Sequence, residues 1–368
     1  METKAAVLYE YQAPLKIETV ELEDPKEREV LVQFKSAGLC HSDLSVVNGV
    51  LKSSPPMVPG HEGAGIVKKT GAGVTRVQSG DHVVLLWVPV CGHCYYCQRG
   101  ETVLCELKDT IRTGTMIDNT YRMRNNRGQG IGKMGGVGSF SEYNVVNEES
   151  LLVIDKDIPF DVAAIAGCAM ITGLGAVLNK AKVKPGSTVA VIGSGGVGLN
   201  IIQGSVLADA AKIIAIDVLD HKLDLAKQFG ATHTINAAAQ DPVSKVKKLT
   251  GQVGVDYAFE ALGTVDTART AFNLIRRGGH MIMVGIPGKE ETFCFSLAEL
   301  PLMDKSISGS YYGSGDVAAD IHAFLSLYKN GRIQLDELIT GRYDIENINQ
   351  GMEDLASGKN ARGVVIYP

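Results

Sequence analysis

The first part of the chain, residues 4 to about 143, consists of short β-branched runs separated by turn residues. Apolar runs at 30–34, 65–67 and 82–86 are bounded by glycine, proline, serine and aspartate, which favour turns. We therefore predict a mainly β segment. The part from Arg112 to Gly138, which includes Arg122 and Lys133, lacks this pattern and is expected to be a long loop with a solvated basic face.

After about residue 161 the pattern changes, and apolar strands alternate with helical periodicity. Strands are predicted at 187–192, 212–217, 255–259 and 280–284, with helices at 196–210 and 220–229 between them. Such alternation indicates a parallel sheet covered by helices on both faces. A helical stretch at 317–329 and a terminal strand at 363–367 follow. The predicted fold class is α/β, a doubly wound parallel sheet joined to a mainly β domain.

Composition narrows the possible functions. The length of 368 residues suggests about two domains, and 45% hydrophobic with 21% charged residues is typical of a folded protein rather than a disordered one. A net charge of −5 argues against nucleic acid as a partner and against anionic membrane surfaces. No secretory signal pattern opens the chain, and the uncharged stretches at 162–178 and 185–208 are too short or broken by glycine. We therefore expect a cytoplasmic protein without a membrane span.

Four of the seven cysteines are grouped in one short segment, as Cys91-x2-Cys94-x2-Cys97-x7-Cys105. In a reducing compartment such grouping indicates metal rather than disulfides. Four thiolates around Zn²⁺ leave no open position, so this site would be structural. An iron–sulfur cluster also uses four cysteines, but nothing else in the chain suggests electron transfer. We expect His93, between two of the cysteines, to be a bystander.

A glycine-rich turn follows the strand predicted at 187–192. Gly193, Gly195 and Gly198 form the pattern G-x-G-x-x-G at the start of a helix, where backbone N–H groups and the helix dipole favour a pyrophosphate. Asp217 stands at the end of the next strand, where a carboxylate accepts hydrogen bonds from ribose hydroxyls and repels a 2′-phosphate. These features predict NAD rather than NADP. The alternative is that Asp217 only caps a turn.

Further motifs complete a resemblance to a known family. Cys40-His41-Ser42-Asp43, Gly60-His61-Glu62 and the segment around Cys168 occur in the same order, with the cysteine-rich loop and glycine turn, as in the zinc-dependent medium-chain alcohol dehydrogenases. The resemblance covers nearly the whole chain. It implies a GroES-like catalytic domain of residues 1–169 and 310–368, with a structural zinc lobe at about 88–108, and a Rossmann NAD-binding domain of residues 170–309.

The resemblance also implies a catalytic zinc held by Cys40, His61 and Cys168. Glu62 corresponds to a carboxylate that can approach the metal transiently, and Asp43 to one that orients the ligand histidine. Ser42 corresponds to the hydroxyl that hydrogen-bonds the alcohol oxygen.

NAD and substrate contacts follow from the same resemblance. Besides the glycine turn and Asp217, the implied cofactor-binding residues are His41, Thr172, Val197, Lys222, Val284 and Arg362. The implied lining of the substrate channel is Leu51, Trp87, Phe140, Ile286 and Tyr311. Trp87 would narrow the inner pocket and favour primary alcohols and aldehydes.

The implied reaction is reversible hydride transfer between an alcohol carbon and NAD, with zinc lowering the pKa of the alcohol. Many relatives end the proton relay with a histidine, but the matching residue here is Ser45, so the last step stays open. We expect a pH profile without a histidine-like limb near pH 6.5–7.

Two other activities are possible for members of this family, and the sequence also bears on the oligomeric state. A thiol-adduct formaldehyde dehydrogenase, of the glutathione or mycothiol type, is disfavoured because Leu51 and Asp109 replace the acidic and basic residues that grip glutathione. A zinc-independent reductase of the same fold would lack the zinc ligands. The long insertion at 112–138 is typical of dimeric relatives, so a homodimer is expected.

Overall fold

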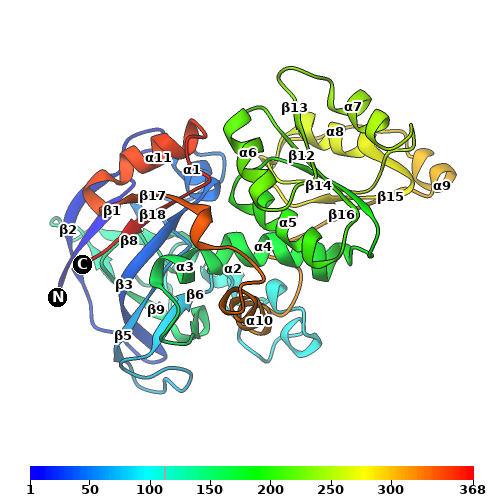
Figure 1. The fold of residues 1–368 in the computed structure, drawn as a ribbon. Coiled ribbons are helices and arrows are strands. Elements are labelled where there is room, and N and C mark those ends of the chain that lie inside the picture. Colours follow the sequence, from blue (N-terminus) through cyan, green and yellow to red (C-terminus); the bar gives the residue numbers. More distant parts are fainter. Residues whose placement is uncertain (112) are drawn as a thin grey trace. The chain divides into compact units, whose positions relative to one another are not determined.

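The computed structural model describes residues 1–111 and 113–368, in two compact units (Figure 1). Arg112, at the start of the expected loop, lies outside the described residues. The first unit is Met1–Cys168, Asp316–Leu325 and Leu335–Pro368, and the second is Ala169–Gly315 and Ser326–Gln334. The domain limits given above stay a prediction.

The first unit is built on two sheets, as its β-branched runs predict. A five-stranded sheet has the order β1-β2-β7-β8-β4, and a seven-stranded sheet has the order β10-β6-β5-β3-β18-β17 with β9 also paired to β3. The strands are β1 (Glu2–Val7), β2 (Lys16–Leu22), β3 (Glu29–Leu39), β4 (Met57–Val58), β5 (Ala64–Thr70), β6 (His82–Leu85), β7 (Met123–Arg124), β8 (Gly130–Lys133), β9 (Tyr143–Asn147), β10 (Leu151–Val153), β17 (Ile339–Tyr343) and β18 (Arg362–Ile366). Its helices include α1 (His41–Val47), α2 (Lys108–Ile111), α3 (Phe160–Ile165) and α11 (Ile348–Ala356), and α10 (Val317–Lys329) begins in it.

Strand β3 forms the centre of this unit. It is buried along nearly its whole length and pairs with β5, β9 and β18. Val30, Val32 and Phe34 are fully buried in one hydrophobic core. Because the strand is held by pairing and burial along its length, the position of its last residue, Leu39, is fixed. Cys40 follows directly and is therefore held in place as well.

The prediction of a solvated loop at 112–138 is only partly right: residues 126–129 are exposed, but Arg122 and Lys133 are buried. Within the described part of that segment, β7 and β8 form an antiparallel pair that joins the five-stranded sheet. Arg122 is fully buried because Glu29 and Asp118 both accept hydrogen bonds from its guanidinium, which compensates for the loss of water. Lys133 is only 1% exposed. Charge along the sequence therefore gave no measure of exposure here.

The second unit contains a six-stranded parallel sheet in the order β13-β12-β11-β14-β15-β16. Figure 1 shows the helices of this unit packed around the sheet. The order is that of the doubly wound dinucleotide-binding fold, so the predicted fold class is confirmed. Its strands are β11 (Thr188–Ile192), β12 (Lys212–Asp217), β13 (His233–Asn236), β14 (Val255–Glu260), β15 (Ile275–Met283) and β16 (Ser306–Gly309). Its helices are α4 (Ile171–Gly175), α5 (Gly196–Leu207), α6 (Asp220–Gln228), α7 (Pro242–Leu249), α8 (Val265–Leu274) and α9 (Glu299–Met303).

A long apolar helix runs from Phe160 to Ala181 and includes two π-helical segments, Ala166–Met170 and Ala176–Ala181. By length and composition alone it could cross a membrane, but 83% of its most apolar window is buried inside the protein. A buried core helix passes the same test. The first π-helical segment matters for the site because it contains Cys168.

Candidate functional site

Four buried side chains from distant parts of the chain meet within the first unit. Cys40 follows β3 and caps α1, His61 and Glu62 lie between β4 and β5, and Cys168 lies in the first π-helical segment. One donor atom from each lies within 4.8 Å of the other three. π-helical turns are rare and often occur at functional sites, as here.

Asp43 holds two members of this cluster in place. One of its carboxylate oxygens lies 2.8 Å from His61 Nδ1, and the other accepts a hydrogen bond from the Cys40 backbone N–H at 2.9 Å. Asp43 itself is fully buried in the first turn of α1. Because Nδ1 is engaged by Asp43, Nε2 is the ring nitrogen left to face the cluster.

Arg362 places a positive charge beside the cluster. It is buried at the start of β18 and donates to Glu62 Oε1 at 2.7 Å and to the Leu39 carbonyl at 3.0 Å. Burial raises the pKa of the Glu62 carboxyl to about 8, although Arg362 favours its charged form. Burial disfavours the charged form of Arg362, but Glu62 and the thiols outweigh this and raise its pKa.

The sulfur and imidazole groups are strongly perturbed by one another. The pKa of Cys40 lies well below its usual range, chiefly through its hydrogen bond with Cys168, and the same pairing raises the pKa of Cys168. Burial alone would lower the pKa of His61, but Asp43 and Cys40 raise it well above its usual range.

The donor set fits a metal ion. His61 Nε2 is buried and has no hydrogen-bond partner in the structure, and two thiols and a carboxylate lie beside it. Two cysteines and one histidine are a known ligand set of catalytic Zn²⁺, which leaves a fourth position open. Ser42 Oγ lies 3.9 Å from the Cys40 sulfur, so a hydroxyl also lies at this centre.

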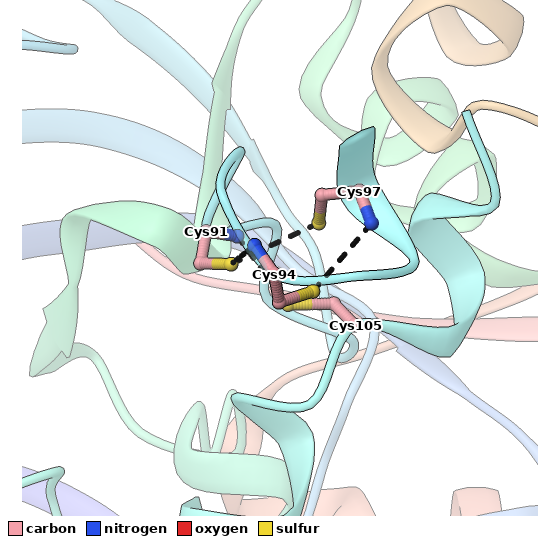
Figure 2. Close-up of side chains that lie close together, drawn as sticks. All are labelled: Cys91, Cys94, Cys97 and Cys105. Carbon is pink, nitrogen blue, oxygen red and sulfur yellow. Dashed lines mark hydrogen bonds between the residues drawn. The ribbon is translucent and has the colours of Figure 1, made fainter. Parts of the chain in front are cut away.

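The second cluster is the loop of Cys91, Cys94, Cys97 and Cys105, whose sulfur atoms also lie within 4.8 Å of one another (Figure 2). Backbone N–H groups point at the sulfurs, from Cys94 to Cys91 Sγ at 3.3 Å and from Cys97 to Cys94 Sγ at 3.5 Å. These contacts suit thiolates, because N–H donors stabilise negative sulfur. Four sulfurs in this arrangement fit a closed tetrahedral zinc site.

In the second unit the glycine turn joins β11 to α5. Gly193 has a φ of +95°, and a Cβ added at Gly198 would lie 1.8 Å from the Gly193 carbonyl oxygen. An added Cβ at Gly195 would meet no atom within 4 Å, so there is open space beside its backbone. These are the tight turn, close packing and open approach that the three glycines predict.

Asp217 ends β12 beside this turn. Its carboxylate accepts hydrogen bonds from the backbone N–H of Ser194 at 2.8 Å, of Val218 at 2.8 Å and of Leu219 at 3.1 Å. It therefore does cap the turn, and it is 9% exposed. Each carboxylate oxygen has two lone-pair directions, so a ribose hydroxyl could still be accepted.

The other residues implied by the resemblance fall into both units. Trp87 lies edge-on to His61 with ring centroids 6.0 Å apart, and Phe140 is fully buried against Gly60. His41, Leu51 and Arg362 also belong to the first unit, whereas the second holds Thr172, Val197, Lys222, Val284, Ile286 and Tyr311.

Sequence reasoning missed Gly38, which the site needs. A Cβ added there would lie 2.0 Å from Glu62 Oε2, so a larger residue would displace the carboxylate. Gly38 lies inside β3 with no turn motif around it. A glycine inside a strand, two residues before Cys40, was the one available signal.

Comparison with known proteins places the chain in a family. Residues 26–156 match the alcohol dehydrogenase GroES-like domain, and residues 196–330 match the zinc-binding dehydrogenase domain. Over 370 aligned residues the chain is 40% identical to the NDMA-dependent alcohol dehydrogenase of Amycolatopsis methanolica, covering 100% of this chain and 99% of that one. The chain belongs to the zinc-type medium-chain alcohol dehydrogenases.

Two further members of this family are similar over the whole chain. The crystal structure of benzyl alcohol dehydrogenase from Acinetobacter calcoaceticus has a TM-score of 0.93 at 31% identity, covering 100% of both chains. The S-(hydroxymethyl)glutathione dehydrogenase of Synechocystis sp. is 38% identical over 375 residues, again covering 100% of both. The predicted family is confirmed: the protein is an alcohol dehydrogenase, an oxidoreductase whose substrates are small alcohols or aldehydes.

Proposed function

We propose that the protein is a dehydrogenase with two zinc ions per chain that uses NAD to interconvert primary alcohols and aldehydes. The observation that carries this proposal is the buried cluster of Cys40, His61, Glu62 and Cys168, in which His61 Nε2 has no hydrogen-bond partner among the described residues. An orphaned buried imidazole nitrogen is costly unless a ligand takes it up.

The chain's own groups have distinct roles at this centre. When bound, the zinc would lower the pKa of an alcohol hydroxyl, and the nicotinamide would accept the hydride. Cys40, His61 and Cys168 hold the metal, while Asp43 fixes the His61 tautomer. Glu62 accepts a hydrogen bond from Arg362 and lies beside the ligands, where its carboxylate could bind the metal transiently.

Proton release would begin at Ser42, whose hydroxyl can accept from the substrate and donate onward. Ser45 lies one turn further along α1 and is half-buried. Its hydroxyl does not titrate near neutral pH, so the proton passes to solvent without a histidine step.

The second unit would bind NAD through the glycine turn. Gly195 leaves open space for the pyrophosphate at the start of α5, and Asp217 would accept from the ribose hydroxyls beside Lys222. Val197, Thr172 and Val284 would contact the nicotinamide end.

Trp87 is the basis for proposing primary alcohols. Its ring lies next to His61, and on the proposed function it would limit the space for a bulky secondary alcohol. The relative named benzyl alcohol dehydrogenase supports including aromatic primary alcohols among the candidates.

A thiol adduct of formaldehyde is the second candidate, supported by the Synechocystis relative named for that substrate. Leu51 is apolar and Asp109 is acidic, whereas glutathione-dependent relatives have an acidic and a basic residue at these positions to bind glutathione. These two side chains therefore disfavour binding of a glutathione adduct. Burial of Arg122 and Lys133 also removes two cations that such an anionic adduct could have met.

A homodimer is part of the proposal. Strand β16 pairs only with β15 in the described sheet, so it is an edge. Leu297 and Leu302, in the segment just before this edge, are 76% and 80% exposed. Apolar side chains beside an open edge favour pairing with a second copy.

The test combines metal analysis with an activity panel. We expect two zincs per chain and oxidation of aliphatic, allylic and benzylic primary alcohols, faster than of secondary alcohols or of formaldehyde with glutathione. Each assay is run with added NAD⁺ and with NDMA, because the Amycolatopsis relative is named NDMA-dependent. Activity with NDMA alone, together with NAD recovered from denatured protein, would mean that NAD stays bound. Turnover that survives complete removal of metal would end the proposal.

A further inference from the structure

The first cysteine of the four-cysteine loop is held from outside the loop. Arg76 lies in the connection between β5 and β6, and its guanidinium donates to the Val90 carbonyl at 2.6 Å and to the Cys91 carbonyl at 3.1 Å. These two peptide groups lead directly into the loop. A planar guanidinium fork fixes two acceptors in one geometry, whereas the three donors of an ammonium group rotate and impose no such geometry.

Arg76 is itself anchored to a buried group. The backbone N–H groups of Thr75 and Arg76 donate to Glu148 Oε2, at 2.8 Å and 3.0 Å. Glu148 is fully buried and forms an ion pair with Arg28 at 3.1 Å. The guanidinium of Arg76 is exposed, but its starting point on the backbone is therefore fixed.

The peptide groups that Arg76 holds precede a tight turn, in which a glycine supplies the positive φ. Gly92 has a φ of +85°, and a Cβ added there would lie 3.8 Å from Arg76 Nη2, so the guanidinium lies against the turn. This turn brings the Cys94 N–H back to Cys91 Sγ. Its geometry decides whether that N–H supports the sulfur. His93 Nδ1 lies 3.1 Å from the same Cys91 carbonyl.

The positive charge of Arg76 should also stabilise the metal-bound loop. Four thiolates around Zn²⁺ carry a net charge of −2, which nearby cations stabilise. Arg99, over the Tyr95 ring at 5.2 Å, is another cation of the loop, but no described hydrogen bond joins it to a ligand's peptide group. Comparing variants of Arg76 and Arg99 therefore distinguishes the effect of a nearby positive charge from the effect of the two hydrogen bonds that Arg76 donates.

We propose that Arg76 is a positioning residue for the four-cysteine loop. Its fork holds the peptide carbonyls of Val90 and Cys91, presets the turn at Gly92 and slows the loss of the metal. The proposal rests on the proposed function, in which these four cysteines bind zinc.

The test measures zinc release rather than turnover. In a Cys168→Ser background, which on the proposed function keeps only the zinc of the four-cysteine loop, zinc transfer to excess chelating dye is followed over time. The variants are Arg76→Ala, Arg76→Lys and, as the matched control with the same change in charge, Arg99→Ala. Cobalt-loaded samples add the thiolate charge-transfer spectrum as a second readout.

We expect Arg76→Ala to release zinc roughly three- to tenfold faster, the effect of losing one or two solvent-exposed hydrogen bonds. Arg76→Lys should restore less than half of the difference, and Arg99→Ala, which removes charge but no hydrogen bond to a ligand's peptide group, should accelerate release much less than Arg76→Ala does. Equal rates for Arg76→Ala and the parent, or equal acceleration by Arg99→Ala, would overturn the proposal. If Arg76→Ala does not fold, the comparison of Arg76→Lys with the parent decides in the same way. A parent protein with no zinc would instead refute the proposed structural zinc site.

Discussion

Single residues in this protein have environments that their type does not suggest. Lys133 is the clearest example, because its ammonium group is sealed in the first unit against the Val145 carbonyl and, at 2.9 Å, the Met116 sulfur. Burial lowers the pKa of Lys133 to about 7, with Arg122 acting in the same direction and Glu29 and Asp118 opposing it. None of these acids is bonded directly to the amine in the described structure.

This burial makes the free energy of unfolding depend on pH. The unfolded chain binds the Lys133 proton up to about pH 10.5 and the folded protein only up to about pH 7, so stability rises with pH between these values. Lys133→Met should therefore stabilise the protein by an amount on the order of a few kcal/mol at pH 7, shrinking towards pH 10.

Denaturant unfolding of both proteins from pH 6 to pH 10 measures this difference. Lys68→Met, at an exposed lysine of β5, is the control and should show a difference that does not change with pH. A Lys133→Met difference that is flat over the same range would contradict a buried, shifted amine.

At the scale of elements, the spacing of residues within one short segment can be enough to form a binding site. The turn from β11 to α5 is such a segment, because its three glycines serve three separate needs within a few residues. The four-cysteine loop is another. In both, the spacing of residues is itself the structural information.

The glycine turn gives a prediction that separates packing from binding. Gly198→Ala places a methyl group 1.8 Å from the Gly193 carbonyl oxygen, so it should destabilise the protein by roughly 1–3 kcal/mol and weaken NAD binding. Gly195→Ala meets nothing in the protein and has an ordinary backbone conformation, with φ −82°. It should leave the unfolding temperature unchanged and still weaken NAD binding at least about tenfold.

Thermal unfolding and nucleotide titration distinguish the two variants. Tight NAD binding by Gly195→Ala would show that the pyrophosphate does not occupy the open space at this turn.

At the scale of the whole molecule, the two candidate metal sites differ in what they hold together. The four-cysteine loop draws its ligands from one segment, whereas the cluster of Cys40, His61 and Cys168 joins a strand end, a connection and a core helix. A closed site contributes to folding, while a site with an open position contributes to chemistry.

Two cysteine substitutions should therefore affect different properties, one the stability and the other the activity. Cys105→Ser should lose one zinc and lower the unfolding temperature by about 5–10 °C, because metal binding there contributes directly to folding. Cys168→Ser should also lose one zinc but keep a near-normal unfolding temperature, while activity falls by more than the roughly 10–100-fold typical of losing a ligand's supporting partner. Zinc content, circular dichroism melting and alcohol oxidation are measured on the same samples. Full activity in Cys168→Ser would exclude that residue as a ligand of the catalytic metal.

The sequence by itself determined the features that are local in the chain. Strand and helix patterns, the glycine turn and the spacing of Cys91 to Cys105 all act over a few residues, so they predicted the doubly wound sheet and the metal loop. The set of Cys40, His61 and Cys168 came from the resemblance to a family, because no local pattern joins residues so far apart.

Only the tertiary structure decided which distant side chains meet and which charges are buried. It brought the Cys40 cluster within 4.8 Å, paired Arg362 with Glu62, and sealed Arg122 and Lys133 inside a segment whose composition predicts a solvated loop. The physical reason is that burial and ion pairing depend on long-range contacts. The free energy of a charge is set by the groups that fold against it, and the residues next to it in sequence do not reveal them.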